Sequence, residues 1–338
     1  MKIDIVIATF NRSVRASKTA QKFLDLKNRF FSNIIIVDSS DDLTILDYPQ
    51  DPAVVYIRSS HKNQPFQRYL GFRYSKADVI LFLDDDLHLI DPDTLHSQLP
   101  TLKDERVVGI SFTSSGGNEF VESVPKAVFP GKTNQLTRGL KWLSGRPELH
   151  PGKFWLCGLR GARQNQEKVE YVGGASGFAL RRISAFVNFN FTLLDILEMR
   201  IGTAEDLLIG FTASRQGQII SANKAVFFHD HQNNSIYSSD YFRFNQNVAF
   251  SRLFLSLEYA RLTGMKRSIA RYHYHWYMLW RLLSMLVSAI IQPSSKRWDG
   301  LRGWLSGWVK ATFWKPRPLA IAEEYWRAEA EKDLTNVS

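Results

Sequence analysis

The sequence predicts an α/β protein with a mainly parallel sheet flanked by helices and a helical region at its C-terminal end. Short apolar runs such as residues 3–9 (IDIVIAT) and 79–83 (VILFL) do not alternate with polar residues, which is typical of strands buried on both faces. Segments with helical spacing separate these runs, which is the order of a parallel sheet with right-handed crossovers. After Asn233, aromatic and aliphatic residues recur at helical spacing.

The first half of the chain supplies most of the predicted sheet. After the strand at 3–9, residues 15–31 carry apolar side chains at helical spacing, and residues 34–37 and 54–57 are two further strands. Residues 64–74 predict a helix that leads into the strand at 79–83.

The second part of the sheet is less regular. Residues 107–112 predict a strand, and residues 113–163 form an irregular stretch rich in Gly, Pro, Lys and Trp. Residues 170–182 predict two strands joined by a glycine-rich turn, residues 202–217 a helix with acids in its first turn, and residues 224–228 a strand.

Three consecutive carboxylates, Asp84, Asp85 and Asp86, follow the strand at 79–83. Like charges at short range raise the cost of ionising one another, so a positive partner is expected there. Ligands of open α/β sheets bind beyond the carboxyl ends of the strands, which suggests a hard divalent cation carrying a phosphorylated ligand. The alternative is a solvated turn or a helix cap, with Asp91-Pro92 starting the next helix.

The net charge of +10 belongs to the C-terminal part of the chain. Residues 261–320 contain eleven Lys or Arg and one acid, together with six of the nine Trp residues. The predicted helices at 241–262, 271–291 and 298–313 lie largely in this segment, but residues 277–291 are too short to span a bilayer. Two explanations stay open: contact with an anionic membrane surface, or packing against the α/β domain or in a homodimer interface.

The single cysteine, Cys157, excludes an internal disulfide framework and a thiolate zinc cluster, and is expected to be a small buried side chain rather than a nucleophile. No signal peptide is recognisable in MKIDIVIATFNR. We therefore expect a cytoplasmic protein, either free or peripheral at the inner face of the cell membrane.

Ordered motifs over residues 1–231 resemble the inverting family 2 glycosyltransferases of the GT-A fold. They are IVIATFNR, IIIVDSS, NQPFQRYLGFRYSKADVILFLDDD, EYVGGASGFALRR and GTAEDLLIGFTASRQG. The resemblance implies a GT-A nucleotide-diphospho-sugar transferase fold with a Rossmann-like mixed, mainly parallel sheet. It also implies Mn²⁺- or Mg²⁺-dependent transfer from a UDP-, GDP- or dTDP-linked sugar to a hydroxyl of a glycan or lipid-linked acceptor.

The resemblance also implies roles for particular residues. Asp206 matches the general base, Glu205 and Gly174 lie on the acceptor side, and Asp86 matches the metal ligand. His229 or His231 completes the coordination of the cation, and the sequence does not separate them. The residues on the nucleotide-sugar side are Thr9, Asn11, Arg12, Asp38, Arg68, Asp84 and Asp85. Outside this context Asn11 reads as a helix cap, Asp38 as an Asx-turn and Arg68 as a surface arginine.

We expect a catalytic domain at residues 1–235, with a nucleotide-binding half at 1–112 and an acceptor half at 113–235. Residues 236–338 would form a basic, Trp-rich helical region. A sugar nucleotidyltransferase, which would release pyrophosphate, is one competing class. A non-catalytic nucleic-acid-binding protein would use the positive charge, but the predicted site is acidic, so we expect no nucleic-acid partner.

Overall fold

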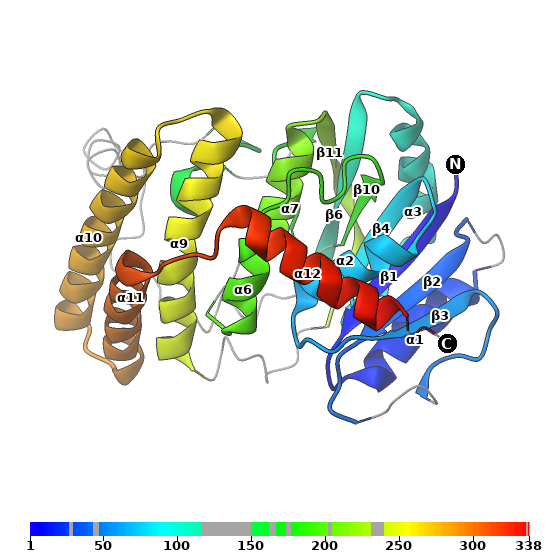
Figure 1. Cartoon of the computed structure of the whole chain (residues 1–338), viewed down its shortest axis with the longest axis horizontal. Coiled ribbons are helices and arrows are strands. Elements are labelled where there is room, and N and C mark those ends of the chain that lie inside the picture. The colour runs from blue at the N-terminus through cyan, green and yellow to red at the C-terminus, as the bar shows by residue number, and fades with distance from the viewer. Residues whose placement is uncertain are drawn as a thin grey trace.

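A computed structural model describes the chain except for residues 27–29, 43–46, 117–149, 162–166, 174–176, 202–204, 231–239, 336 and 338, and the side chain of Asn223. The α/β part and a group of long helices lie side by side, and the last helix runs back across the α/β part (Figure 1). No helix among the described residues is both long enough and apolar enough to cross a membrane.

Among the described residues, nine strands form the main sheet. Its order is β3-β2-β1-β4-β10-β6-β11-β5, with β9 beside β11. The strands are β1 (Ile3–Thr9), β2 (Asn33–Asp38), β3 (Val54–Arg58), β4 (Val79–Asp84), β5 (Leu87–Leu89), β6 (Val107–Gly116), β9 (Lys168–Val169), β10 (Phe178–Arg181) and β11 (Gln218–His229). A separate pair joins β7 (Phe154–Trp155) to β8 (Leu159–Arg160).

The predicted mixed, mainly parallel sheet is confirmed. Strands β1 to β4 pair in parallel, as do β6 and β11, whereas β10, β5 and β9 run antiparallel to their neighbours. The register places Thr9 of β1 beside Asp38 of β2, and Ala8 beside Asp84 of β4. The carboxyl ends of these three strands therefore meet at one edge of the sheet.

Helices cover both faces of the sheet. The described α-helices are α1 (Ser13–Leu24), α2 (Gln64–Tyr74), α3 (Pro92–Gln98), α6 (Thr192–Glu198), α7 (Glu205–Ser214), α9 (Tyr241–Thr263), α10 (Arg267–Ile291), α11 (Ser295–Phe313) and α12 (Leu319–Leu334). Along β1, Ile5 and Ile7 join the core under α1 and α3, whereas Val6 joins the core under α2 and α7. Burial on both faces explains the unbroken apolar runs in the sequence.

Helix α1 is shorter than its apolar pattern predicts, because it ends at Leu24 rather than near residue 31. Phe30 and Phe31 still pack edge-on against Phe23, with ring centroids 6.5 and 6.2 Å away. The apolar pattern thus continues past the helix because the returning chain buries the same kind of side chain.

The three predicted C-terminal helices form as α9, α10 and α11, and α11 packs closely on α9. A Cβ atom at Gly303 would lie 2.1 Å from the carbonyl oxygen of Phe242, and one at Gly307 would lie 2.3 Å from that of Gln246. Glycines therefore line the face of α11 that packs on α9.

Cys157 lies against Ser256 of α9 and is buried. Burial raises the pKa of its thiol to about 11, as expected for an inert side chain.

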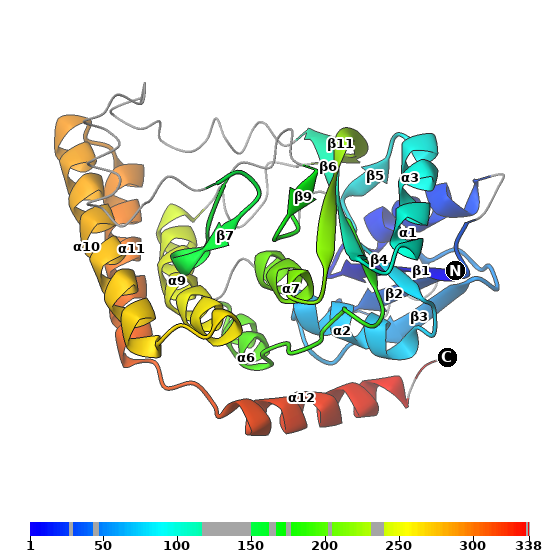
Figure 2. The same cartoon turned by 90° about the horizontal axis from the view of Figure 1, so that it is seen from above.

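Helix α12, which the sequence reading missed, returns to the α/β part and packs on α2 and α6 (Figure 2). Trp326 is buried against the rings of His61 and Phe66, with centroids 4.8 and 5.1 Å away. Its indole N–H donates to Asp195 at 2.9 Å. Asp333 accepts hydrogen bonds from the backbone and side chain of Ser60 at 2.9 and 3.1 Å. The last helix thus holds the loop that enters α2.

His61 makes this attachment sensitive to pH. Its ring nitrogens lie 3.2 Å from Glu198 of α6 and 3.3 Å from Glu329 of α12. The contact with Glu198 is the main cause that raises the pKa of His61, and Glu329 adds to it against the opposing effect of burial. The two contacts of the protonated imidazole therefore stabilise the folded protein. Their contribution is fully present below the unfolded pKa of His61, about 6.5, and is lost as the pH rises through its higher folded pKa.

We therefore expect the free energy of unfolding of the wild type to exceed that of His61→Gln by more at pH 6 than at pH 9. Urea denaturation of both proteins at the two pH values measures the difference. Loss of the ring contacts with Trp326 and Phe66 lowers the stability of the variant equally at both pH values. A gap that is constant or that widens as the pH rises would contradict the assignment.

Candidate active site

The site begins at the carboxyl edge of the parallel strands. Thr9, Asp38 and Asp84 are the last residues of β1, β2 and β4, and Gln67 of α2 joins the first two of these strands. Its amide nitrogen donates to the carbonyl oxygens of Thr9 at 2.6 Å and Val37 at 2.9 Å. Helix α2 is therefore fixed against the edge where ligands of open α/β sheets bind.

Arg68 of α2 connects segments that lie far apart in the sequence. Its guanidinium contacts Asp84 at 2.6 Å and pairs with Asp206, and it lies 4.0 Å from Glu205. The arginine is 1% exposed. Although burial opposes the charge, the carboxylates of Asp206, Asp84 and Glu205 raise the pKa of Arg68 above its ordinary value. One buried cation thus joins the acidic triplet to the first turn of α7.

Arg12 is the second cation of the site. It lies 3.0 Å from Asp85 and 3.2 Å from Asp86. Asp85 is fully buried, and its other oxygen accepts a hydrogen bond from Thr9 Oγ1 at 2.7 Å. The structure therefore places Asp85 beneath Arg12 and Thr9, where it holds these two residues at the end of β1.

Asp86 and His229 come together through backbone pairing. Strand β11 runs antiparallel to β5 with His229 opposite Leu87, and the backbone N–H of Asp230 donates to the carbonyl oxygen of Asp86 at 3.0 Å. The imidazole Nε2 of His229 lies 3.3 Å from a carboxylate oxygen of Asp86. Both side chains are largely buried, so they form a small polar pair beside the acidic triplet.

The acids of the site outnumber its cations. Asp84, Asp85, Asp86, Glu205 and Asp206 contribute five carboxylates against two guanidiniums, a net formal charge of −3. Burial raises the pKa of Asp84 to about 6 and that of Asp85 to about 7. Burial and the neighbouring Asp206 raise the pKa of Glu205 to about 8. Further positive charge would stabilise the ionised forms.

The donor atoms present fit a divalent cation. Asp86 and His229 offer one carboxylate and one imidazole within 3.3 Å of each other, in a site with an excess of acid. No group of three or more His, Cys, Asp or Glu in the part of the chain described here is arranged as a complete metal site. Mg²⁺ commonly takes one or two carboxylates and completes its shell with water and substrate phosphate, so an incomplete protein set suits this chemistry.

Asn11 and Asp38 are held by local hydrogen bonds. Asn11 has a φ of 53°, which Asn tolerates, and its amide nitrogen donates to Asp41 at 2.8 Å. Asp38 is fully buried and accepts from the backbone N–H of Ser40 at 2.7 Å and from Tyr48 at 3.0 Å. Asp38 thus adopts the Asx-turn that the sequence left open, and the more exposed carboxylate at this edge is Asp41.

Two predicted residues, Gly174 and His231, lie outside the described residues. Two further residues that the structure brings to the site, Gln64 and Lys62, were not predicted from the sequence. Gln64 donates to Asp84 at 2.7 Å, and Lys62 pairs with Asp41 while lying 5.0 Å from the ring centroid of Phe10. The signal was present in the sequence, because Lys62 and Gln64 flank Asn63, the N-cap residue of α2.

The chain belongs to glycosyltransferase family 2, since the family model described as Glycosyl transferase family 2 matches residues 4–186. The protein is therefore a glycosyltransferase, an enzyme that transfers a sugar from a nucleotide-sugar donor, and its mixed sheet is of the GT-A type. This membership selects glycosyl transfer over the nucleotidyltransferase and nucleic-acid-binding alternatives. Among curated proteins, none matches the sequence.

Solved structures with a similar arrangement include S. aureus TarS (residues 1–349), with a TM-score of 0.48, 12% identity, and coverage of 98% of this chain and 89% of that chain. The mannosyltransferase PcManGT from Pyrobaculum calidifontis, solved with GDP-Man and Mn²⁺, has a TM-score of 0.45 and 12% identity. The match covers 92% of this chain and 87% of that chain. Glucosyl-3-phosphoglycerate synthase from Mycobacterium tuberculosis, solved with Mn²⁺, UDP and phosphoglyceric acid, has a TM-score of 0.42 and 16% identity. The match covers 78% of this chain and 79% of that chain. These similarities assign neither donor nor acceptor to this chain.

Proposed function

We propose that this protein is an inverting, metal-dependent glycosyltransferase that uses Asp206 as its general base. The observation that carries the proposal is the bridge that Arg68 makes between Asp84 at the end of β4 and Asp206 at the start of α7. It brings the acids suited to the donor and the carboxylate suited to the acceptor within the reach of one guanidinium. Inversion needs these two groups on opposite sides of the reacting sugar carbon.

The chemistry follows from that arrangement. Asp206 accepts the proton of the acceptor hydroxyl as its oxygen attacks the anomeric carbon on the face opposite the leaving phosphate. The bond to the nucleoside diphosphate breaks, and the sugar is transferred with inversion. Burial and the neighbouring Asp206 raise the pKa of Glu205 to about 8, and in its protonated form Glu205 is suited to donate a hydrogen bond to a second acceptor oxygen. Arg68 keeps Asp206 oriented.

On the donor side, Asp86 and His229 would hold Mn²⁺ or Mg²⁺, with His231 as the alternative to His229. The cation supplies neutralisation of the charge that develops on the departing diphosphate. Arg12 is placed to add positive charge from the end of β1, since its side chain is 45% exposed. The edge formed by Thr9, Asn11 and Asp38, together with Asp84, would face the nucleoside of a UDP-, GDP- or dTDP-linked sugar.

We further propose that residues 1–112 bind the nucleotide and residues 113–235, including Gly174, shape the acceptor site, with residues 236–338 as a separate helical region. The acceptor would be a hydroxyl of a glycan or a lipid-linked sugar. The basic, Trp-rich composition of residues 261–320 supports an acceptor that is presented near anionic groups.

A thermal-shift screen with UDP, GDP, dTDP and their sugars, each with and without Mn²⁺, tests the donor assignment. A nucleotide that binds only the folded protein stabilises it by about 2.7 kcal/mol at 100 times its dissociation constant. We expect one base to stabilise the protein with Mn²⁺ and EDTA to remove most of the effect. Asp86→Asn should lose the Mn²⁺ dependence, whereas Asp93→Asn in α3 should retain it. Failure of every nucleotide would overturn the proposal.

A further inference from the structure

Helix α10 presents an apolar face to solvent along most of its length. Its inner face packs through Tyr274, Tyr277 and Met278, all buried. The opposite face carries exposed large side chains at helical spacing: Leu279, Leu283, Leu286, Val287, Ile290 and Ile291. Their exposures run from 37% to 64%, and Ile290 is the most exposed of the six. Monomeric soluble proteins rarely expose contiguous apolar surfaces of this extent unless the surface binds something.

The neighbouring helix α11 repeats the pattern. Trp298, Leu305, Val309 and Phe313 are exposed along its outer side, and Phe313 is 79% exposed. Its buried side carries Trp304 and the small residues Gly300, Gly303, Gly307 and Ala311, so close packing against α9 fixes which side of α11 faces out. The two helices lie side by side at the end of the molecule farthest from β2 and β3 (Figures 1 and 2). We call these exposed residues of α10 and α11 the outer apolar face.

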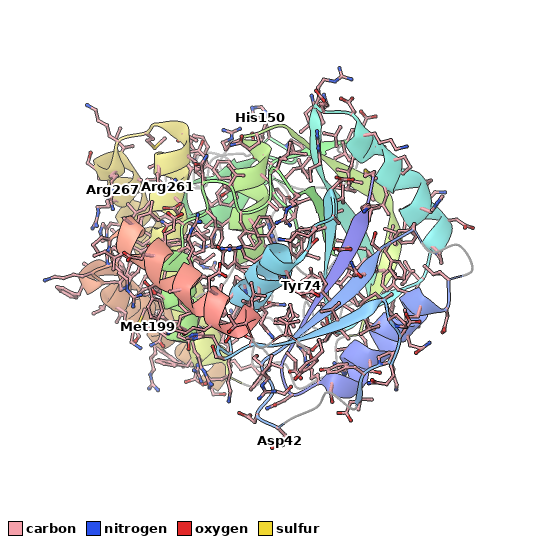
Figure 3. The ribbon with its side chains drawn as sticks, turned by 45° about the vertical axis from the view of Figure 1, so that its right-hand side comes forward. Asp42, Tyr74, His150, Met199, Arg261 and Arg267 are labelled. Atoms are coloured by element: carbon pink, nitrogen blue, oxygen red, sulfur yellow. The ribbon has the colours of Figure 1, made fainter. Side chains whose placement is uncertain are left out.

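The exposed cations of α10 lie at the start of the helix, apart from its exposed apolar residues. Arg281 lies within α10, but its guanidinium is turned inward over Trp304, 5.8 Å from the ring centroid. Exposed cations lie around the start of α10 (Lys266, Arg267 and Arg271), in the first turn of α11 (Lys296), and at and just beyond its end (Lys310 and Lys315). Arg302 lies within the exposed side of α11, between Trp298 and Leu305. Figure 3 shows Arg267 at the outer end of the helical region, well apart from Asp42 near the sheet.

The charge distinguishes between occupants of the outer apolar face. A second copy of the chain would bring two segments of eleven Lys or Arg and one acid against each other, which is repulsive. An anionic bilayer offers acyl chains for the apolar residues and phosphates for the lysines and arginines at the helix ends. No helix in the described part of the chain could cross a membrane, so the helices would lie in the interface.

We propose that α10 and α11 dock this protein onto the surface of an anionic phospholipid bilayer through the outer apolar face. The side chains of α10 enter the boundary between headgroups and acyl chains, and the cations at the helix ends contact lipid phosphates. This docking is independent of the donor chemistry, since none of these residues lies at the acidic site.

Sedimentation of the full chain with vesicles tests the proposal. We expect the wild type to partition onto phosphatidylcholine vesicles that contain phosphatidylglycerol about tenfold more strongly than onto phosphatidylcholine alone, and added salt to weaken that partition. Leu283→Glu combined with Val287→Glu should reduce partition at least about tenfold. Ile90→Glu combined with Ile183→Glu is the matched control, because both isoleucines are exposed outside the helical region, and it should bind as the wild type does.

A second variant separates docking from folding. Lys296→Glu combined with Arg302→Glu changes only exposed cations, and should lower partition onto the anionic vesicles without lowering partition onto phosphatidylcholine alone. Thermal unfolding midpoints identify any variant that has lost its fold. Three results would overturn the proposal: no partition of the wild type at low salt, unchanged partition of the Leu283/Val287 variant, or a wild-type dimer in sedimentation velocity that this variant converts to monomer.

Discussion

Asp206→Asn is expected to lower kcat by about 10²- to 10⁴-fold, the usual contribution of a positioned general base. Asparagine has nearly the same shape and retains an oxygen that accepts from Arg68, so the architecture of the site is preserved. Its amide cannot take the proton of the acceptor hydroxyl. Donor binding should therefore change little, and steady-state kinetics together with nucleotide-dependent thermal shifts measure the two effects separately.

Asp195→Asn is the matched control for this substitution. Asp195 lies on α6 away from the acidic site, and accepts from the indole of Trp326 at 2.9 Å, so its kcat should remain near the wild-type value. Glu205→Gln provides the competing outcome. If Glu205 were the base, its raised pKa of about 8 would make turnover increase as the pH rises through 8, and Glu205→Gln rather than Asp206→Asn would abolish transfer.

Arg68→Met is expected to lower the free energy of unfolding by about 3–5 kcal/mol, the usual cost of removing one partner of a buried ion pair. The guanidinium is 1% exposed and contacts three carboxylates, which would be left without their shared cation. Methionine keeps much of the volume, so the loss reports charge more than packing. Urea denaturation of the wild type and the variant measures it.

Arg73→Met on the same helix is the control. Arg73 pairs with Glu331, which is 60% exposed, so we expect a loss of about 1 kcal/mol or less. Adding Asp206→Asn to Arg68→Met should recover part of the lost stability, because one of the uncompensated carboxylates is removed. A cost for Arg68→Met no larger than that for Arg73→Met, or strict additivity in the double variant, would contradict the assigned bridge.

The order of elements was largely predictable, because strands such as β1 and β4 that are buried on both faces consist of unbroken runs of apolar residues. The long helices α9, α10 and α11 were predictable because aromatic and aliphatic residues recur in them at helical spacing. Helix α12 was missed since its attachment depends on Trp326 meeting His61 and Phe66, residues more than 200 positions earlier. The end of α1 was misplaced because Phe30 and Phe31 continue its apolar pattern after the helix has ended.

The sequence by itself determined the family, the parallel sheet and the chemical types at the site, since motifs and periodicity are local properties of a chain. Only the tertiary structure decided which of these groups meet. Arg68 contacts Asp84 and Asp206, which are 16 and 138 positions away, and Asp86 meets His229 because β5 pairs with β11. The three carboxylates that repel one another in the sequence have cationic partners supplied by the folding of α2 and the end of β1 around them.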